Sequence, residues 1–310
     1  MNMRQKVTTV TMAFGLAAGV ALASSLPNTT PVPTQMVITV RPANGHAAQQ
    51  NVDARDLTIL QGHTRASIAH VQRLAGDFAD MQLFILLDDS TRSSSLGVHL
   101  PELRAFVASL PASTQVAIGY MRNGTFGLGE PFTTEHDKAA AALRLPESIP
   151  GGNGSPYFAL SDLAKRWPSK ETTNRRAVLM LTDGVDRYYG GAIIDDPYVD
   201  AAIQDTLKNG VMVYSIYLRG AGLYGRGGFT TNVAQSRLME VSAETGGEAY
   251  FQDFTDPVAI APFLTDFQDR LANQYQVTVD DLHGKGVQPV KVRTEAPGLK
   301  IEAPTRIYVR

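Results

Sequence analysis

The sequence predicts an α/β fold: a doubly wound, mainly parallel sheet with helices on both faces, plus small accessory β segments at both ends. Three observations predict it. The apolar runs LFILL, AVLML and VMVYSIYL lack polar alternation, as strands buried on both faces do. Segments with helically spaced apolar residues alternate with these runs. The two ends of the chain instead show alternating patterns rich in Val and Thr.

Bulk composition limits the class of protein. The 310 residues are enough for one main core with smaller appendages. Hydrophobic residues make up 44%, charged residues 19%, and the formal net charge is -2, which argues against a disordered or a nucleic-acid-binding chain. The chain has 0 cysteines, so stability must come from the core, a metal or a partner and not from disulfides.

The N-terminus has the layout of a secretory signal peptide over residues 1–23. A short basic region, MNMRQK, precedes the apolar stretch VTTVTMAFGLAAGVALA, which ends with small residues at Ala21 and Ala23. An uncleaved membrane anchor is the alternative, because the apolar stretch is nearly long enough to span a bilayer. With cleavage, the mature protein has no membrane span and is soluble in a periplasm or outside the cell.

The first elements of the mature chain are a linker and a β-rich lead-in. Residues 24–34 are rich in Pro and Thr, as linkers are. Residues 35–79 contain alternating apolar runs at 36–40 and 56–60, with a third near 66–74.

The main domain is expected over residues 80–275. Strands are predicted at 83–87, 116–120, 177–181, 211–218 and 248–252. Helices are predicted at 100–110, 135–145, 155–167, 198–208, 235–245 and 257–273. Pro101 suits the first turn of its helix, and Asn209-Gly210 suits the end of another. The last 35 or so residues, 276–310, read as a C-terminal β segment of three short runs.

Two of the predicted strands end on an acid. LFILLDDS reaches Asp88, and AVLMLTDG reaches Asp183. Ligands of parallel sheets bind at the carboxyl ends of the strands, and the loop GGNGSPYF can bring Ser155 to the same edge. Taken alone, each acid is more typical of a turn or helix cap. Asp89 has no assigned role, and we expect it to be solvated.

Asp88-x-Ser90, the loop hydroxyl of Ser155 and Leu-Thr-Asp-Gly ending at Gly184 together resemble the von Willebrand factor type A domain. The resemblance covers residues 80–275, and the lead-in strands and AETGGEAYF look closest to exported bacterial members. It implies a metal-ion-dependent adhesion site for Mg²⁺, with Mn²⁺ or Ca²⁺ also compatible, because hard cations prefer oxygen ligands. Asp88, Ser90 and Ser155 would be ligands, and Asp183 would bind through water.

One position departs from the family pattern. Where that pattern has a second serine this chain has Arg92, and a guanidinium cannot ligate a cation. Either the loop bulges so that Ser93 becomes the ligand and Arg92 faces a partner's carboxylate, or the metal site is degenerate and Arg92 or water lies between the acids.

The loops at this edge have the composition of a protein-binding rim. They combine glycines with residue types common at interfaces. The contact candidates are Tyr188, Tyr189, Tyr224 and Phe229, together with Arg92. The alternative is a set of flexible, solvated loops.

The function expected from the sequence is therefore an exported, non-enzymatic binding or adhesion module for a protein or cell-envelope ligand. The chain has no G-x-S-x-G elbow, no H-E-x-x-H pair and no phosphate-loop lysine. The alternatives are a metal-dependent envelope hydrolase and a structural subunit with a degenerate metal site. The sequence leaves the oligomeric state open.

Overall fold

The computed structural model describes residues 33–43, 51–149, 152, 154–171, 173–189, 195–220 and 227–310. The expected signal peptide, most of the expected linker and the rim candidate Tyr224 lie outside these residues. Within the described ranges, none of the helices is long and apolar enough to cross a membrane.

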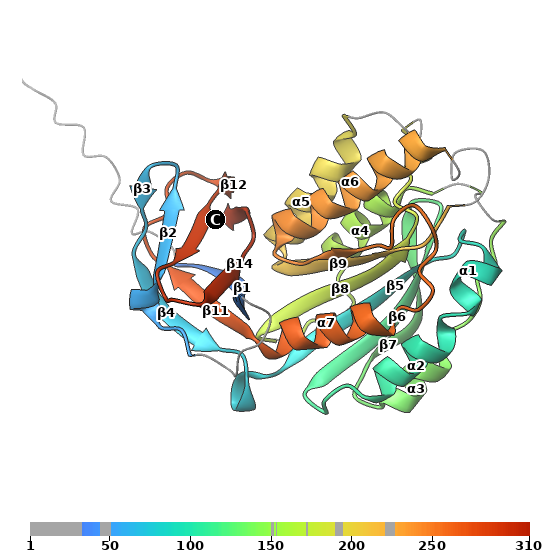
Figure 1. Ribbon diagram of the computed structural model, residues 1–310, viewed down its shortest axis with the longest axis horizontal. Helices are drawn as coiled ribbons and strands as arrows, with labels where there is room; N and C mark the ends of the chain where they lie inside the picture. The colour runs from blue at the N-terminus through green and yellow to red at the C-terminus, as the bar shows by residue number, and fades with distance from the viewer. Residues whose placement is uncertain are drawn as a thin grey trace, which may run out of the picture. The chain divides into compact units, whose positions relative to one another are not determined.

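A six-stranded mixed sheet forms the centre of the α/β part (Figure 1). Its order is β10-β9-β8-β5-β6-β7, and every neighbouring pair is parallel except β6 with β7. The strands are β5 (Met81–Asp88), β6 (Thr114–Arg122), β7 (Thr125–Thr133), β8 (Arg175–Thr182), β9 (Val211–Tyr217) and β10 (Ala249–Tyr250). The parallel strands β5 and β8 lie side by side, so their carboxyl ends meet at one edge.

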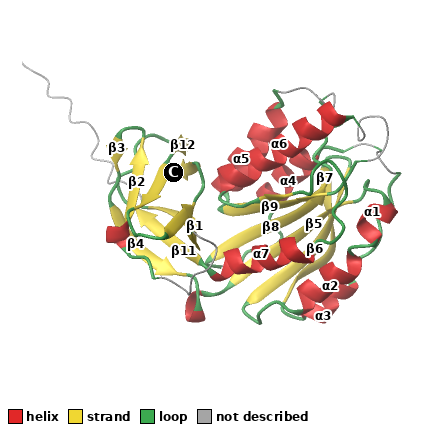
Figure 2. Cartoon of the chain, in the orientation of Figure 1, coloured by secondary structure: helices red, strands yellow, loops and turns green. Residues whose placement is uncertain are grey.

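Helices cover both faces of this sheet (Figure 2). On β5, Leu83, Ile85 and Leu87 pack with α2, α3 and α7, whereas Phe84 and Leu86 pack with α4, α5 and α6. Burial of both faces explains why the strands carry no polar alternation. The helices are α1 (Ser93–Gly97), α2 (Leu100–Ala108), α3 (His136–Ala141), α4 (Pro156–Lys165), α5 (Pro197–Lys208), α6 (Gly228–Thr245) and α7 (Ala261–Ala272).

Three elements differ most from the sequence-based expectation. The short helix α1 was not predicted, because five residues with three serines show no helical spacing of apolar positions. The antiparallel edge strand β7 was not predicted, because TFGLGEPFT contains two glycines and a proline and lies largely exposed. Helix α6 begins at Gly228, seven residues before its predicted start at Gln235. Its first turns contain Gly, Thr and Asn, which have low helix propensity. These residues are helical because of tertiary packing and not because of their own preference.

The two ends of the chain build one β unit with its own core. Strand β1 pairs antiparallel with both β11 and β14, so segments from either side of the α/β part share a sheet. Met36, Ile38 and Val277 belong to its buried core. The strands are β1 (Thr34–Pro42), β2 (Leu57–Gln61), β3 (Thr64–Arg65), β4 (Ile68–Arg73), β11 (Gln274–Val279), β12 (Gly286–Pro289), β13 (Lys291–Thr294), β14 (Leu299–Glu302) and β15 (Arg306–Val309), with two 3-10 turns at Ala54–Asp56 and Gly76–Phe78.

Two buried arginines join the β unit to the α/β part. Arg175 of β8 donates to the backbone oxygen of Leu271 at 2.6 Å and to Oε1 of Gln274 at 2.8 Å. Arg270 of α7 forms ion pairs with Asp266 of its own helix and with Glu302 of β14. Arg270 is a paired charge, the form in which buried arginines are tolerated. Arg175 instead donates to neutral oxygens, its buried Nε has no partner among the described residues, and burial lowers its pKa to about 10.

Candidate functional site

The two strand-end acids lie next to each other, as expected. Asp88 is the last residue of β5, and Asp183 follows the end of β8, the neighbouring parallel strand. Both are buried, with 6% and 3% of their surface exposed. Thr182 Oγ1 donates to Asp88 Oδ2 at 2.8 Å and so links the two strand ends directly.

The loop after β5 turns back onto the Asp88 carboxylate. The backbone nitrogen of Ser90 lies 2.9 Å from Asp88 Oδ1, and the Ser90 hydroxyl lies 2.8 Å from the same oxygen. Burial raises the pKa of Asp88, and the charge of Asp183 raises it further, while the bonds from Ser90 and the charge of Arg187 lower it. Two buried carboxylates on neighbouring strand ends therefore favour a nearby cation or a proton on one of them.

Arg187 supplies that positive charge. Its guanidinium forms an ion pair with both Asp183 oxygens, through a short contact from Nη2 to Oδ2 and a 3.3 Å contact from Nη1 to Oδ1. Its side chain is only 7% exposed. The carboxylate of Asp183 also accepts from the backbone nitrogen of Val185 at 3.0 Å. A charged group with this burial and pairing belongs to the site itself, although the sequence reading did not select it.

The loop that carries Ser155, before α4, is hydrogen-bonded to the loop that follows β8. Ser155 Oγ donates a short hydrogen bond to Asp186 Oδ2, and it accepts from the backbone nitrogen of Phe158 at 3.1 Å as the N-cap of α4. The backbone nitrogen of Arg187 donates to Gly154 O at 3.0 Å. The loop after β8 and the loop before α4 are thus held together by side-chain and backbone bonds.

Among the described residues, the side chains of Arg92 and Ser93 make none of the hydrogen bonds of this cluster. Arg92 is the extended N-cap residue of α1, and its Nη2 is buried with no hydrogen-bond partner among the described residues. Ser93 begins α1 with an exposed side chain. In the part of the chain that the structure describes, no hydrogen bond joins Ser93 to Asp88 or Asp183, and the guanidinium paired with the acids is that of Arg187.

The arrangement of these residues does not fit a divalent cation. A Mg²⁺ ion needs about six oxygen ligands with free lone pairs. Here Asp88 accepts from Ser90 and Thr182, Asp183 is paired with Arg187, and the Ser155 hydroxyl is directed at Asp186. Over the described residues, no cluster of three His, Cys, Asp or Glu side chains is placed to hold a metal.

The expectation that Asp89 is solvated is wrong. Its carboxylate is fully buried and accepts from the guanidinium groups of Arg122 and Arg144 at 2.5 and 2.8 Å. The hydroxyl of Ser148 and the backbone nitrogen of Glu147 complete the set at 3.0 Å each. Burial acts to raise the pKa of Asp89, but these bonds outweigh it and hold the pKa below its usual value. Asp89 is thus a structural anchor for the loops beside the site.

Aromatic side chains form an exposed rim next to the Arg187 ion pair, and we call Phe158, Tyr188, Tyr189 and Tyr198 the aromatic rim. Phe158 lies with its ring centroid 6.3 Å from that of Tyr188 and 4.6 Å from that of Tyr198, which in turn is 5.7 Å from Tyr189. Phe158, Tyr188 and Tyr189 are 42%, 48% and 36% exposed. The sequence pointed to the two loop tyrosines but missed Phe158 and Tyr198, which lie in helices.

Phe229, another predicted contact residue, is 64% exposed in the first turn of α6. No ring contact joins it to the aromatic rim among the described residues, so the structure brings together two of the four predicted aromatic contacts, Tyr188 and Tyr189.

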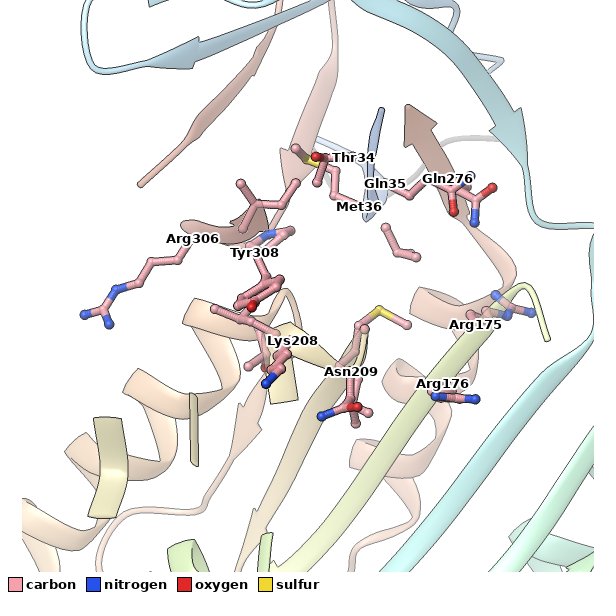
Figure 3. Close-up of a pocket in the computed structure, with 18 of the residues that line it drawn as sticks. Thr34, Gln35, Met36, Arg175, Arg176, Lys208, Asn209, Gln276, Arg306 and Tyr308 are labelled. Carbon is pink, nitrogen blue, oxygen red and sulfur yellow. The ribbon is translucent and has the colours of Figure 1, made fainter. Parts of the chain in front are cut away.

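A separate cleft of about 440 Å³ lies at the opposite ends of β8 and β9 (Figure 3). Residues of β1, β8 and β15 line it, and among the described residues on its walls five are basic and none is acidic. The basic ones are Arg175, Arg176, Lys208, Arg306 and Arg310. None of the predicted site residues lines this cleft, so it is not part of the candidate site.

No protein-family model matches the chain, and no curated protein matches it in sequence. Two solved structures are similar in fold. One is an aerotolerance-related membrane protein from Bacteroides fragilis, with 14% identity and a TM-score of 0.42 over 62% of this chain and 98% of that one. The other is the SpRpn10 VWA domain, with 10% identity and a TM-score of 0.41 over 60% of this chain and 94% of that one. The strand order, with Asp88 and Asp183 on neighbouring strand ends, agrees with the von Willebrand factor type A resemblance at the level of the fold.

Proposed function

We propose that the chain is a non-enzymatic binding module that recognises an envelope protein at the carboxyl edge of its sheet, through the aromatic rim. The exposure of these rings is the observation that carries the proposal. Aromatic residues on a rigid support contribute most of the free energy in many protein interfaces. Phe158 and Tyr198 stand on helices α4 and α5, so the rim is held in place before a partner arrives.

The hydrolase alternative has less support from the contacts at this edge. A nucleophile or general base needs a polar atom within reach of substrate. Asp88 and Ser155 are buried, and each is engaged by neighbouring groups of the protein. The aromatic rim, by contrast, is open to solvent.

The partner can be trapped by a photo-crosslinking amino acid placed at Tyr189. Phe78 is the matched control site, because it is similarly exposed, at 44%, but precedes β5 at the other end of the sheet. We expect one protein to crosslink from position 189 and not from position 78, and its identity to follow from mass spectrometry.

The purified partner then tests the aromatic rim quantitatively. Replacing both Tyr188 and Tyr189 by Ser should weaken binding at least tenfold, which corresponds to about 1.4 kcal/mol, while Phe78→Ser leaves the dissociation constant unchanged. Equal binding by all three proteins, measured by calorimetry, would show that the aromatic rim is not the binding surface.

We also infer that the module acts outside the cytoplasm. The basic, apolar and small-residue order of the first 23 residues supports export. N-terminal sequencing of the protein recovered from its native host should start at Ser24, after Ala23. A mature chain that retains Met1 in the cytoplasmic fraction contradicts export.

A further inference from the structure

We propose that the guanidinium of Arg187 is a built-in cation that takes the place of a divalent metal between the two strand-end acids, so that this edge is assembled without metal. Arg187 is not part of the motif that carries the resemblance. The proposal concerns the ion chemistry of the edge and holds whether or not the aromatic rim binds a protein.

The first argument is charge. Asp88 and Asp183 are two buried acids on adjacent strand ends, where a cation is favoured beside them. Arg187 contacts both oxygens of Asp183, which is the paired geometry that a planar guanidinium favours and an ammonium group does not.

The second argument is the use of the oxygen donors. Thr182 and Ser90 both donate to Asp88, and Ser155 donates to Asp186. Hydroxyls that donate to a neighbouring carboxylate can still offer lone pairs. However, a metal placed between the acids would meet a guanidinium of the same sign at the distance of a hydrogen bond.

The third argument is that the guanidinium of Arg187 is held by contacts besides its ion pair. Its Nη1 also lies 3.3 Å from the backbone oxygen of Val185, and its backbone nitrogen is bonded to Gly154 O. The residue before it, Asp186, accepts from the backbone nitrogens of Tyr188 and Tyr189 at 2.8 and 2.9 Å. Entry of a metal would therefore have to break the bonds of the guanidinium to Asp183 and to Val185 O, while the backbone on either side of Arg187 is held in place.

The test is a titration of the purified mature protein with Mn²⁺, followed by the electron paramagnetic resonance signal of the free ion. We expect no bound Mn²⁺ in the unaltered protein at millimolar concentrations. Arg187→Gln should bind one ion, and the double variant Asp183→Asn/Arg187→Gln should lose it again. Arg187→Lys keeps the positive charge and should bind none.

The control is Arg166→Gln. Arg166 pairs with Asp162 at the same spacing of four residues as Arg187 with Asp183, but its side chain is 57% exposed. This variant should bind no Mn²⁺, because removing an exposed arginine creates no site between buried acids.

Two outcomes overturn the proposal. One is stoichiometric Mn²⁺ binding by the unaltered protein with the affinity of Arg187→Gln, and the other is a folded Arg187→Gln that binds none. If Arg187→Gln does not fold, the free energies of unfolding of Asp183→Asn/Arg187→Gln and Asp183→Asn alone are compared. The double variant should be the more stable of the two, because it lacks an unpaired buried charge, and equal or lower stability contradicts the charge pairing.

Discussion

At the scale of single residues, the acids at the carboxyl edge of the sheet differ in their partners: Asp88 is bonded by hydroxyls, Asp183 by one guanidinium and Asp89 by two. Asp88 and Asp183 were predictable as neighbours, because both end apolar runs that had to be parallel strands. Asp89 was not, since its partners Arg122 and Arg144 are 33 and 55 residues away and only the fold brings them together. Arg187 follows Asp183 by four residues, but its burial and its ion pair could not be predicted. They depend on the conformation of the loop after β8, which composition does not determine.

Asp89→Ala tests the structural role assigned to this acid. Removing a fully buried carboxylate leaves two guanidinium groups without their shared acceptor, but these are 50% and 35% exposed and can be hydrated in part. We expect a loss of about 2–3 kcal/mol in the free energy of unfolding, measured in urea. Asp200→Ala breaks the partly exposed pair with Arg306 and should cost no more than about 1 kcal/mol. Similar losses in both would mean that Asp89 is not an anchor.

Gly124 tests how tightly the aromatic rim is seated. Its φ is 68°, and an added Cβ would lie 2.7 Å from Tyr188 Cε2. Gly210 has a similar φ of 64° with nothing within 4 Å of an added Cβ. Both Ala variants should lose about 1 kcal/mol from backbone strain, and Gly124→Ala should lose more because Tyr188 must move. Equal losses in thermal unfolding would show that Tyr188 does not rest on this turn.

At the scale of elements, the strands were easier to predict than the helix ends. The apolar runs in β5, β8 and β9 are short and continuous, which is typical of strands buried on both faces. The structure places all three in the parallel part of the sheet. The edge strand β7 was not predicted. It pairs with a strand on one side only, and its glycines and proline are typical of a loop. Apolar patterns in a sequence indicate which residues are buried. An exposed edge strand has few buried residues, so it shows little of this pattern.

Helix α4 provides a prediction at this scale. Ser155 caps it by accepting from the backbone nitrogen of Phe158, and it also donates to Asp186. Ser155→Ala removes both bonds and should cost about 1–2 kcal/mol, with faster amide exchange at Phe158. Ser155→Thr retains the hydroxyl and should restore most of the loss. An Ala variant as stable and as protected as the unaltered chain would contradict the capping role.

At the scale of the whole molecule, ion pairs around Arg270 join the β unit to the α/β part. Besides Glu302, the group includes Asp266, which also pairs with Arg41 of β1 at 2.8 Å. Burial raises the pKa of Asp266, but hydrogen bonds from Arg270 and Arg41 outweigh it and lower the pKa below its usual range. The pair of Asp266 with Arg270 follows from their i,i+4 spacing on the predicted helix. The pairs with Arg41 and Glu302 could not be predicted from the sequence, because they join segments that are far apart in the chain.

This lowered pKa has a defined pH dependence. A carboxyl with a lower pKa in the folded than in the unfolded chain stabilises the fold above the unfolded value, near pH 4, and loses that contribution as the pH falls through the folded value. Asp266→Asn should therefore flatten the acid side of a plot of unfolding free energy against pH. Thr265→Ser, on the exposed side of the same helix, removes no titratable group and should leave the slope unchanged. Identical slopes in both variants would rule out this source of acid sensitivity.

The pairing of β1 with β11 and β14 has a consequence for the order of folding. In the described chain the whole α/β part lies between β1 and β11, so it is inserted into the β unit and not appended to it. During synthesis, β1 has no strand to pair with until more than 200 further residues have been made. Unpaired strand edges promote aggregation. Folding of the α/β part brings the two ends together and shortens the loop that β1 has to close. The sheet that carries the candidate site thus also serves as the template on which the rest of the chain assembles.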